Sequence, residues 1–207
     1  MGRYDLRLST VLKGRSSLAD GLYASTQVEA PTGWVAMEDI AVGDPVVTRD
    51  HGILPVLAIG PEHRAALWSV RFPEGALGNP EEAFLPPGQP VLIETAFALP
   101  YTGEAHALIP AAALEGWRGI CPHVQAQAEP ILQMRLSRPA LVLAAGLVVG
   151  VKGSETAEAD LVTRLMARPA PAVLPLAAAR HLVAAMMAEE AGAAMRSQAT
   201  LRPVNRA

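Results

Sequence analysis

Residues 21–59 carry the strongest structural signal in the chain and read GLYASTQVEAPTGWVAMEDIAVGDPVVTRDHGILPVLAI. Short runs rich in β-branched residues alternate here with turns built from Pro, Gly and Asp. Proline fixes φ, glycine reaches positive φ, and aspartate bonds to its own backbone, so each of these residues favours a reversal of the chain. The pattern predicts short strands separated by tight turns, at residues 26–29, 34–37, 45–48 and 53–59.

The order and spacing of these strands and turns resemble the opening of a Hint domain, the module shared by inteins and the self-processing half of Hedgehog proteins. That family begins with Cys-Leu-x-x-x-Thr-x-Val and continues through Ile-x-x-Gly-Asp-x-Val to a hairpin with Asp-Gly and Pro-Val. The family's initial cysteine is replaced by Gly21 in this chain. The matching segments are Gly21-Leu22-Tyr23-Ala24-Ser25-Thr26-Gln27-Val28, Ile40-Ala41-Val42-Gly43-Asp44-Pro45-Val46, Asp50-His51-Gly52 and Pro55-Val56.

The resemblance implies a mainly β, Hint-like all-β fold over residues 21–150. Residues 1–20 are then a lead-in segment, and residues 151–207 a helical C-terminal extension and tail. A chain of 207 residues is long enough for one such domain with an extension.

The chain beyond residue 59 continues with short apolar runs broken by Pro and Gly. Because Pro90 cannot donate to a ladder, the strand that follows it is expected near a sheet edge. Pro110 is expected to open a short helix that Gly116 closes. Glu81-Glu82 follow a Gly-Asn-Pro loop and read as a solvated turn. Further strands are predicted at residues 66–72, 91–94, 131–136 and 140–149.

After Gly153 the sequence pattern changes to one that is typical of helices. One helix is predicted over residues 155–167 and a second over 175–196, where Leu and Met side chains recur at helical spacing. The second helix is expected to pack on the sheets or to pair with a second copy of the chain, which would make a homo-oligomer.

The resemblance also locates the residues that self-processing requires. A Cys or Ser side chain attacks the preceding carbonyl, and a His in a Thr/Ser-x-x-His motif protonates the departing amide. The nucleophile position holds Gly21, and the motif falls on residues 86–89, which ends in Gln89. Neither residue can perform its step. The place of an intein's terminal His-Asn pair holds Gly150-Val151, so splicing is not expected.

Three other side chains are candidate nucleophiles. Ser25 and Thr26 lie four and five residues beyond Gly21, and Cys121 stands two residues before His123, close enough in sequence for thiolate activation. The alternative interpretation is structural: Ser25 as a turn residue, Thr26 as a packed strand hydroxyl and Cys121 as a small hydrophobe.

Composition argues against several classes of function. The net charge of −3 and the pI near 6.0 do not indicate the positively charged surface that nucleic-acid binding needs. The single Cys121 and the spacing of the five histidines predict no metal site, and no cofactor is expected. The N-terminus lacks the apolar region of a signal peptide, and no run approaches the ~20 residues that span a bilayer. A cytoplasmic protein is expected.

We therefore expect a catalytically degenerate Hint domain that acts as a structural or binding module for an unknown protein or peptide. Its vestigial site is predicted at Gly21, Thr26 and Gln89, with no catalytic residue. Two alternatives remain open: self-processing with an unconventional nucleophile, and an oligomer-forming adaptor that works through its terminal helices.

Overall fold

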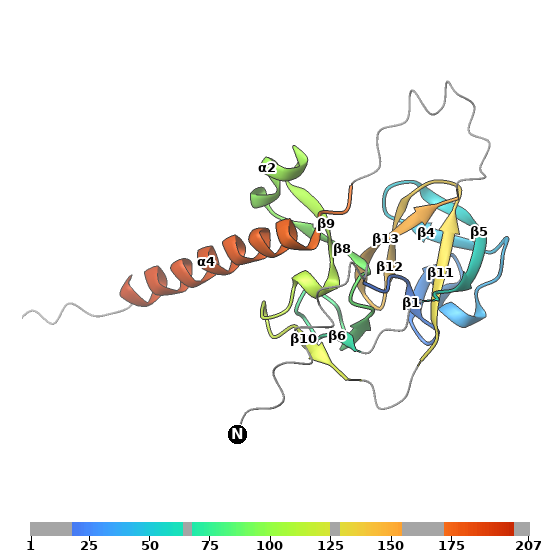
Figure 1. Ribbon diagram of the computed structural model, residues 1–207, viewed down its shortest axis with the longest axis horizontal. Helices are drawn as coiled ribbons and strands as arrows, with labels where there is room; N and C mark the ends of the chain where they lie inside the picture. The colour runs from blue at the N-terminus through green and yellow to red at the C-terminus, as the bar shows by residue number, and fades with distance from the viewer. Residues whose placement is uncertain (1–17, 64–67, 125–128, 155–171, 201–207) are drawn as a thin grey trace, which may run out of the picture.

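The computed structural model describes residues 18–63, 68–124, 129–154 and 172–200 (Figure 1). Ten strands in these ranges form one sheet with the order β3-β2-β12-β4-β5-β11-β13-β8-β9, and β1 pairs with β11. The bounds are β1 (Leu22–Tyr23), β2 (Gln27–Ala30), β3 (Gly33–Ala36), β4 (Pro45–Thr48), β5 (Gly52–Pro61), β8 (Pro90–Glu94), β9 (His106–Pro110), β11 (Ile131–Leu136), β12 (Ala140–Ala144) and β13 (Leu147–Gly153).

The remaining described elements are short, apart from one helix. A three-stranded sheet has the order β10-β6-β7. Its strands and the helices are β6 (Ser69–Phe72), β7 (Ala83–Leu85), β10 (Cys121–His123), η1 (Met37–Asp39), η2 (Ala96–Ala98), α2 (Leu99–Thr102), η3 (Ala111–Ala113) and α4 (Leu176–Thr200).

The predicted strands of residues 21–59 are confirmed as two hairpins. In the first, β2 pairs with β3, and in the second β4 pairs with β5. Gly33 and Gly52 begin the returning strands with φ of +115° and +70°, a conformation that glycine adopts without a steric penalty. Turn chemistry therefore determines this part of the fold locally.

Residues 140–149, predicted as one strand, form parts of two. The chain reverses at Ala145-Gly146, with φ of +49° and +75°, so that β12 and β13 pair as a hairpin. An Ala-Gly pair inside an apolar run lacks the Pro, Asn or Asp that usually marks a turn, and this is why the sequence did not predict the reversal.

β8 lies next to the edge strand β9, near the edge as expected, but it is not itself the edge because it also pairs with β13. Pro90 is tolerated because it is the first residue of the strand. The helix expected after Pro110 is a single 3₁₀ turn, η3, which follows β9. The three-residue strand β7 was not predicted.

The core is formed by side chains that alternate along the strands. Valine and leucine side chains from β4, β5, β11, β12 and β13 are fully buried there. Such positions are Val46, Val56, Leu136, Val142 and Val149.

The helix α4 confirms the prediction for residues 175–196. Its first half carries the buried residues Ala179, Leu182, Val183 and Met186 at helical spacing, and it packs on η2, η3 and β9. Its second half extends away from the strands (Figure 1). None of the described helices is both long and apolar enough to cross a membrane. The predicted helix 155–167 lies outside the described residues, and oligomerisation through 175–196 stays a prediction.

Glu190 anchors α4 to the β domain. Its carboxylate accepts hydrogen bonds from the Trp117 indole at 2.8 Å and from Arg118 Nη2 at 2.7 Å. The Trp117 bond lowers the pKa of Glu190; burial opposes the shift and Arg118 adds to it. The ionised carboxylate thus contributes stability above pH 4.5, which is lost as the pH falls through the lowered pKa.

We predict that Glu190→Gln lowers the free energy of unfolding by up to about 1 kcal/mol near neutral pH, a small value because the side chain is partly exposed. The loss should vanish in strong acid. Urea unfolding at the two pH values tests this, with Glu189→Gln as the control, since Glu189 bonds only to Arg196 among described residues. Equal losses in both variants, or a loss that persists in acid, would contradict the anchoring role.

Candidate functional site

The segment before Gly21 passes directly over the turn that holds Gly88. The Gly88 N–H donates to the Ala19 carbonyl at 2.8 Å. A Cβ on Gly88 would come within 2.6 Å of the Leu18 carbonyl oxygen, so only glycine allows this approach. The backbone on the N-terminal side of Gly21 is therefore seated against the same turn that carries Gln89.

The side chain of Gln89 is buried and joins two distant parts of the backbone. Its Oε1 accepts from the Gly21 N–H at 3.0 Å, while its Nε2 donates to the Gly150 carbonyl at 2.9 Å and to the Pro90 carbonyl at 3.3 Å. A carboxamide can do this because it is a donor and an acceptor at once. The amide therefore provides partners for backbone groups that are partly or fully buried.

The backbone at position 21 has no room for a side chain. Gly21 has a φ of +132°, and a Cβ there would lie 2.7 Å from the Leu132 carbonyl oxygen and 2.8 Å from Ile131 Cγ2. Those atoms belong to β11, whose residue Leu132 pairs with Leu22 in β1. A cysteine or serine at this position would require β1 or β11 to move.

Charged groups surround the Asp20–Gly21 peptide. The Asp20 carboxylate forms an ion pair with Lys152 Nζ at 2.5 Å and accepts from Gln133 Nε2 at 2.9 Å. Together with Gly21 and Gln89 they line a cleft of about 460 Å³. Sequence reasoning missed Asp20, Gln133 and Lys152, because three polar residues scattered over the chain carry no local signal of their association.

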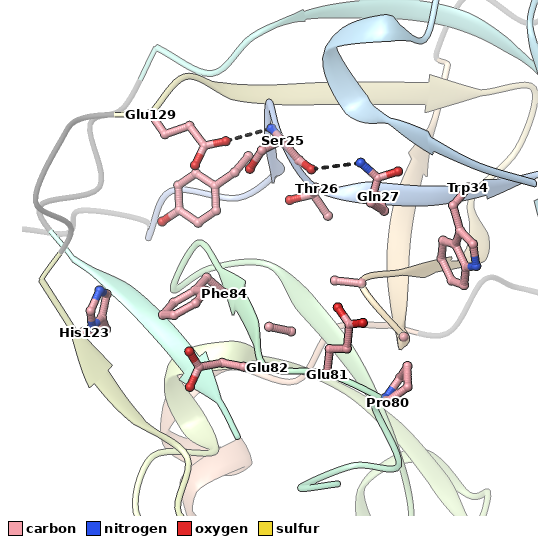
Figure 2. Close-up of a pocket in the computed structure, with 14 residues that line it drawn as sticks. Ser25, Thr26, Gln27, Trp34, Pro80, Glu81, Glu82, Phe84, His123 and Glu129 are labelled. Atoms are coloured by element: carbon pink, nitrogen blue, oxygen red, sulfur yellow. Dashed lines mark hydrogen bonds between the residues drawn. The ribbon is translucent and has the colours of Figure 1, made fainter. Parts of the chain in front are cut away.

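The structure brings Gly21 and Gln89 together but does not bring Thr26 to them. Thr26 is buried and lines a separate cavity, which Ser25 also lines (Figure 2). The reason is the turn at Ala24-Ser25, which ends β1 and redirects the chain into β2.

The other candidate nucleophiles also lie away from the Gly21 cleft. Ser25 is exposed, and its backbone N–H donates to Glu129 Oε1 at 2.7 Å. Cys121 is half-buried in the three-stranded sheet, opposite Arg71. His123, two residues further along, stacks against Phe84 with ring centroids 4.9 Å apart. None of these side chains lines the cleft beside the Asp20–Gly21 peptide.

No group of three or more His, Cys, Asp or Glu side chains among the described residues is arranged to hold a metal ion. The polar groups of the site are the buried Gln89 carboxamide, the Gly21 N–H and the Asp20–Lys152 ion pair. Such a set can bind and orient peptide groups by hydrogen bonding.

The family model described as "Hint domain" matches residues 21–150, and the chain belongs to the Hint domain family. The first and last residues of this range are Gly21 and Gly150, and Gln89 forms a hydrogen bond with each of them. A search of the curated proteins found no match.

Among solved structures, the chain is similar to the MchDnaB-1 intein, with 17% identity and a TM-score of 0.40, covering 63% of this chain and 99% of that one. It is similar to the Msm DnaB1 intein splicing domain, with 20% identity and a TM-score of 0.41, covering 63% and 99%. It also resembles a bacterial intein-like domain from Clostridium thermocellum, with 15% identity and a TM-score of 0.45, covering 63% and 96%.

We predict that Gly21→Ala destabilises the protein more than Gly33→Ala. Both glycines have positive φ, but a Cβ on Gly33 meets nothing within 4 Å, so the difference isolates the crowding at position 21. The excess loss in urea unfolding should be about 1–3 kcal/mol, the usual effect of overpacking. Equal losses would mean that β1 and β11 separate easily and that position 21 accepts a side chain.

Proposed function

We propose that this Hint domain does not cleave itself and acts as a structural or binding module. The observation that carries the proposal is the hydrogen bond from the Gly21 N–H to Gln89 Oε1. Gly21 and Gln89 stand at the positions of the nucleophile and the histidine that the family uses to break the peptide bond. The two residues are in contact here, but Gly21 cannot attack a carbonyl and Gln89 cannot supply a proton.

The direction of this hydrogen bond argues against cleavage. Self-processing needs a proton delivered to the amide nitrogen of residue 21 as it leaves the carbonyl of residue 20. In this chain that nitrogen is the donor, and Gln89 offers it an acceptor oxygen. A carboxamide does not titrate near neutral pH, so it cannot supply the proton. The bond holds the intact peptide in place.

The missing nucleophile argues in the same direction. Attack on the Asp20 carbonyl requires an oxygen or sulfur within about 3–3.5 Å. Gly21 has none. The nearest oxygen nucleophile is the Asp20 carboxylate, which is engaged by an ion pair with Lys152 and a hydrogen bond from Gln133. Ser25, Thr26 and Cys121 all lie outside the cleft. We infer that the cleft is kept as a contact surface for a protein or peptide segment.

The test is the intact mass of the purified full-length chain, measured fresh and after long incubation with thiol and hydroxylamine. These reagents intercept any thioester or ester and release the fragment behind it. We expect one species of unchanged mass, and the same result for Ser25→Ala and Cys121→Ala.

Release of a fragment that begins at residue 21, or at any other single position, would overturn the proposal. Its disappearance in one of the two alanine variants would then identify the nucleophile.

A further inference from the structure

A second cavity, of about 610 Å³, lies on the other side of β1. Leu22 lines the Gly21 cleft, whereas the next residue, Tyr23, lines this cavity, as expected for successive residues of a strand. One wall is formed by residues 25–27 and the opposite wall by residues 80–84, with Trp34 toward one end and His123 toward the other (Figure 2).

The lining of this cavity is acidic. Among the described residues it includes Glu81, Glu82 and Glu129, and no lysine or arginine. Arg71, outside the cavity, pairs with Glu82. Glu129 accepts only a backbone N–H among described residues, and the Glu81 carboxylate has no hydrogen bond or ion pair with a described residue. Two carboxylates therefore face the cavity without a cationic partner from the described chain.

Aromatic rings also line the cavity. Phe84 and His123 are in contact at one end, and Trp34 is 50% exposed at the other. Aromatic faces attract cations through their quadrupole and also pack against the methylene stems of basic side chains. Carboxylates combined with aromatic rings are the lining that an ammonium or guanidinium group on an aliphatic stem requires.

Tyr23 supplies an independent indication of a ligand. It is only 2% exposed, and its hydroxyl lies near Ser69 but makes no hydrogen bond of normal geometry with a described residue. The neighbouring Ser69 hydroxyl donates instead to the His123 carbonyl at 3.2 Å. Burial raises the pKa of Tyr23 to about 12; Ser69 opposes the shift and Glu129 adds to it, so the hydroxyl stays neutral. A buried polar atom without a partner is unusual in a folded protein. Because the hydroxyl is enclosed, a ligand in the cavity would reach it only after a small shift of the Tyr23 ring.

We propose that this cavity binds the cationic side chain of an arginine or lysine, either as the free amino acid or within an extended peptide. Its volume falls in the range of ordinary ligand sites. β3, which carries Trp34, is the outer strand of the sheet, so its backbone is open to a peptide that adds beside it.

The experiment is a titration of the full-length chain with N-acetyl-arginine amide, followed through the indole N–H resonance of Trp34 and assigned with Trp34→Phe. N-acetyl-citrulline amide is the control, because it keeps the shape of arginine and removes the charge. The arginine compound should bind at least about ten-fold more tightly.

Glu81→Gln and Glu129→Gln should each weaken binding by about five-fold, as expected for loss of a charge partner. Glu38→Gln, on η1 and outside the cavity, should leave it unchanged. All variants are first checked for an unchanged NMR spectrum elsewhere. Equal affinity for both compounds, no saturable shift, or insensitivity to both cavity variants would each overturn the proposal.

Free L-arginine and a blocked Ala-Arg-Ala peptide distinguish the two sources of the cation. Tighter binding of the peptide than of free arginine supports a peptide ligand, and tighter binding of free arginine supports a free amino acid. None of these results bears on self-cleavage, so this proposal and the proposed function can fail separately.

Discussion

The fold around the site depends on one buried carboxamide. Gln89 accepts from Gly21 and donates to Gly150, residues that are respectively 68 and 61 positions away in the chain. Removing such a bridge leaves a partly buried N–H and a partly buried carbonyl without these partners, at a cost below the about 1–3 kcal/mol that is typical of a fully buried group. The interaction therefore stabilises the closure of the domain, and under the proposed function it lies where other Hint domains break a peptide bond.

The glycine at position 21 and the glutamine at position 89 depend on each other structurally. With a φ of +132° and β11 packed against it, Gly21 directs its N–H at Gln89 and leaves no space for a nucleophile. Cysteine at position 21 alone would create a steric conflict. Histidine at position 89 alone would offer at most one donor and one acceptor, in place of the three hydrogen bonds that the Gln89 side chain makes. The proposed loss of self-cleavage therefore rests on the backbone as well as on the side chains. Under that proposal the fold is kept while the function differs, because a fold does not by itself confer a function.

Much of the β architecture was predictable, because turn residues act locally. The hairpins that reverse near Gly33 and Gly52 follow directly from Pro, Gly and Asp spacing. The reversal at Ala145-Gly146 was not predictable, because the apolar sequence around it is that of a continuous strand. The association of Gly21 with Gln89 could be predicted only through the family resemblance. Thr26 lies away from both because the chain turns at Ala24-Ser25, and neither of these residues is a strong turn signal in the sequence. The Asp20–Lys152 ion pair had no signal at all, because its partners meet only after folding.

Amide hydrogen exchange at Gly21 tests the central claim most directly. The account predicts that the Gly21 N–H is strongly protected in the native protein and exchanges much faster in Gln89→Met, which keeps the volume but not the hydrogen bonds. Gln27→Met, at an exposed glutamine, should leave the protection unchanged. Rapid exchange at Gly21 in the native chain, or protection that survives Gln89→Met, would show that Gln89 does not hold this peptide and would contradict the account.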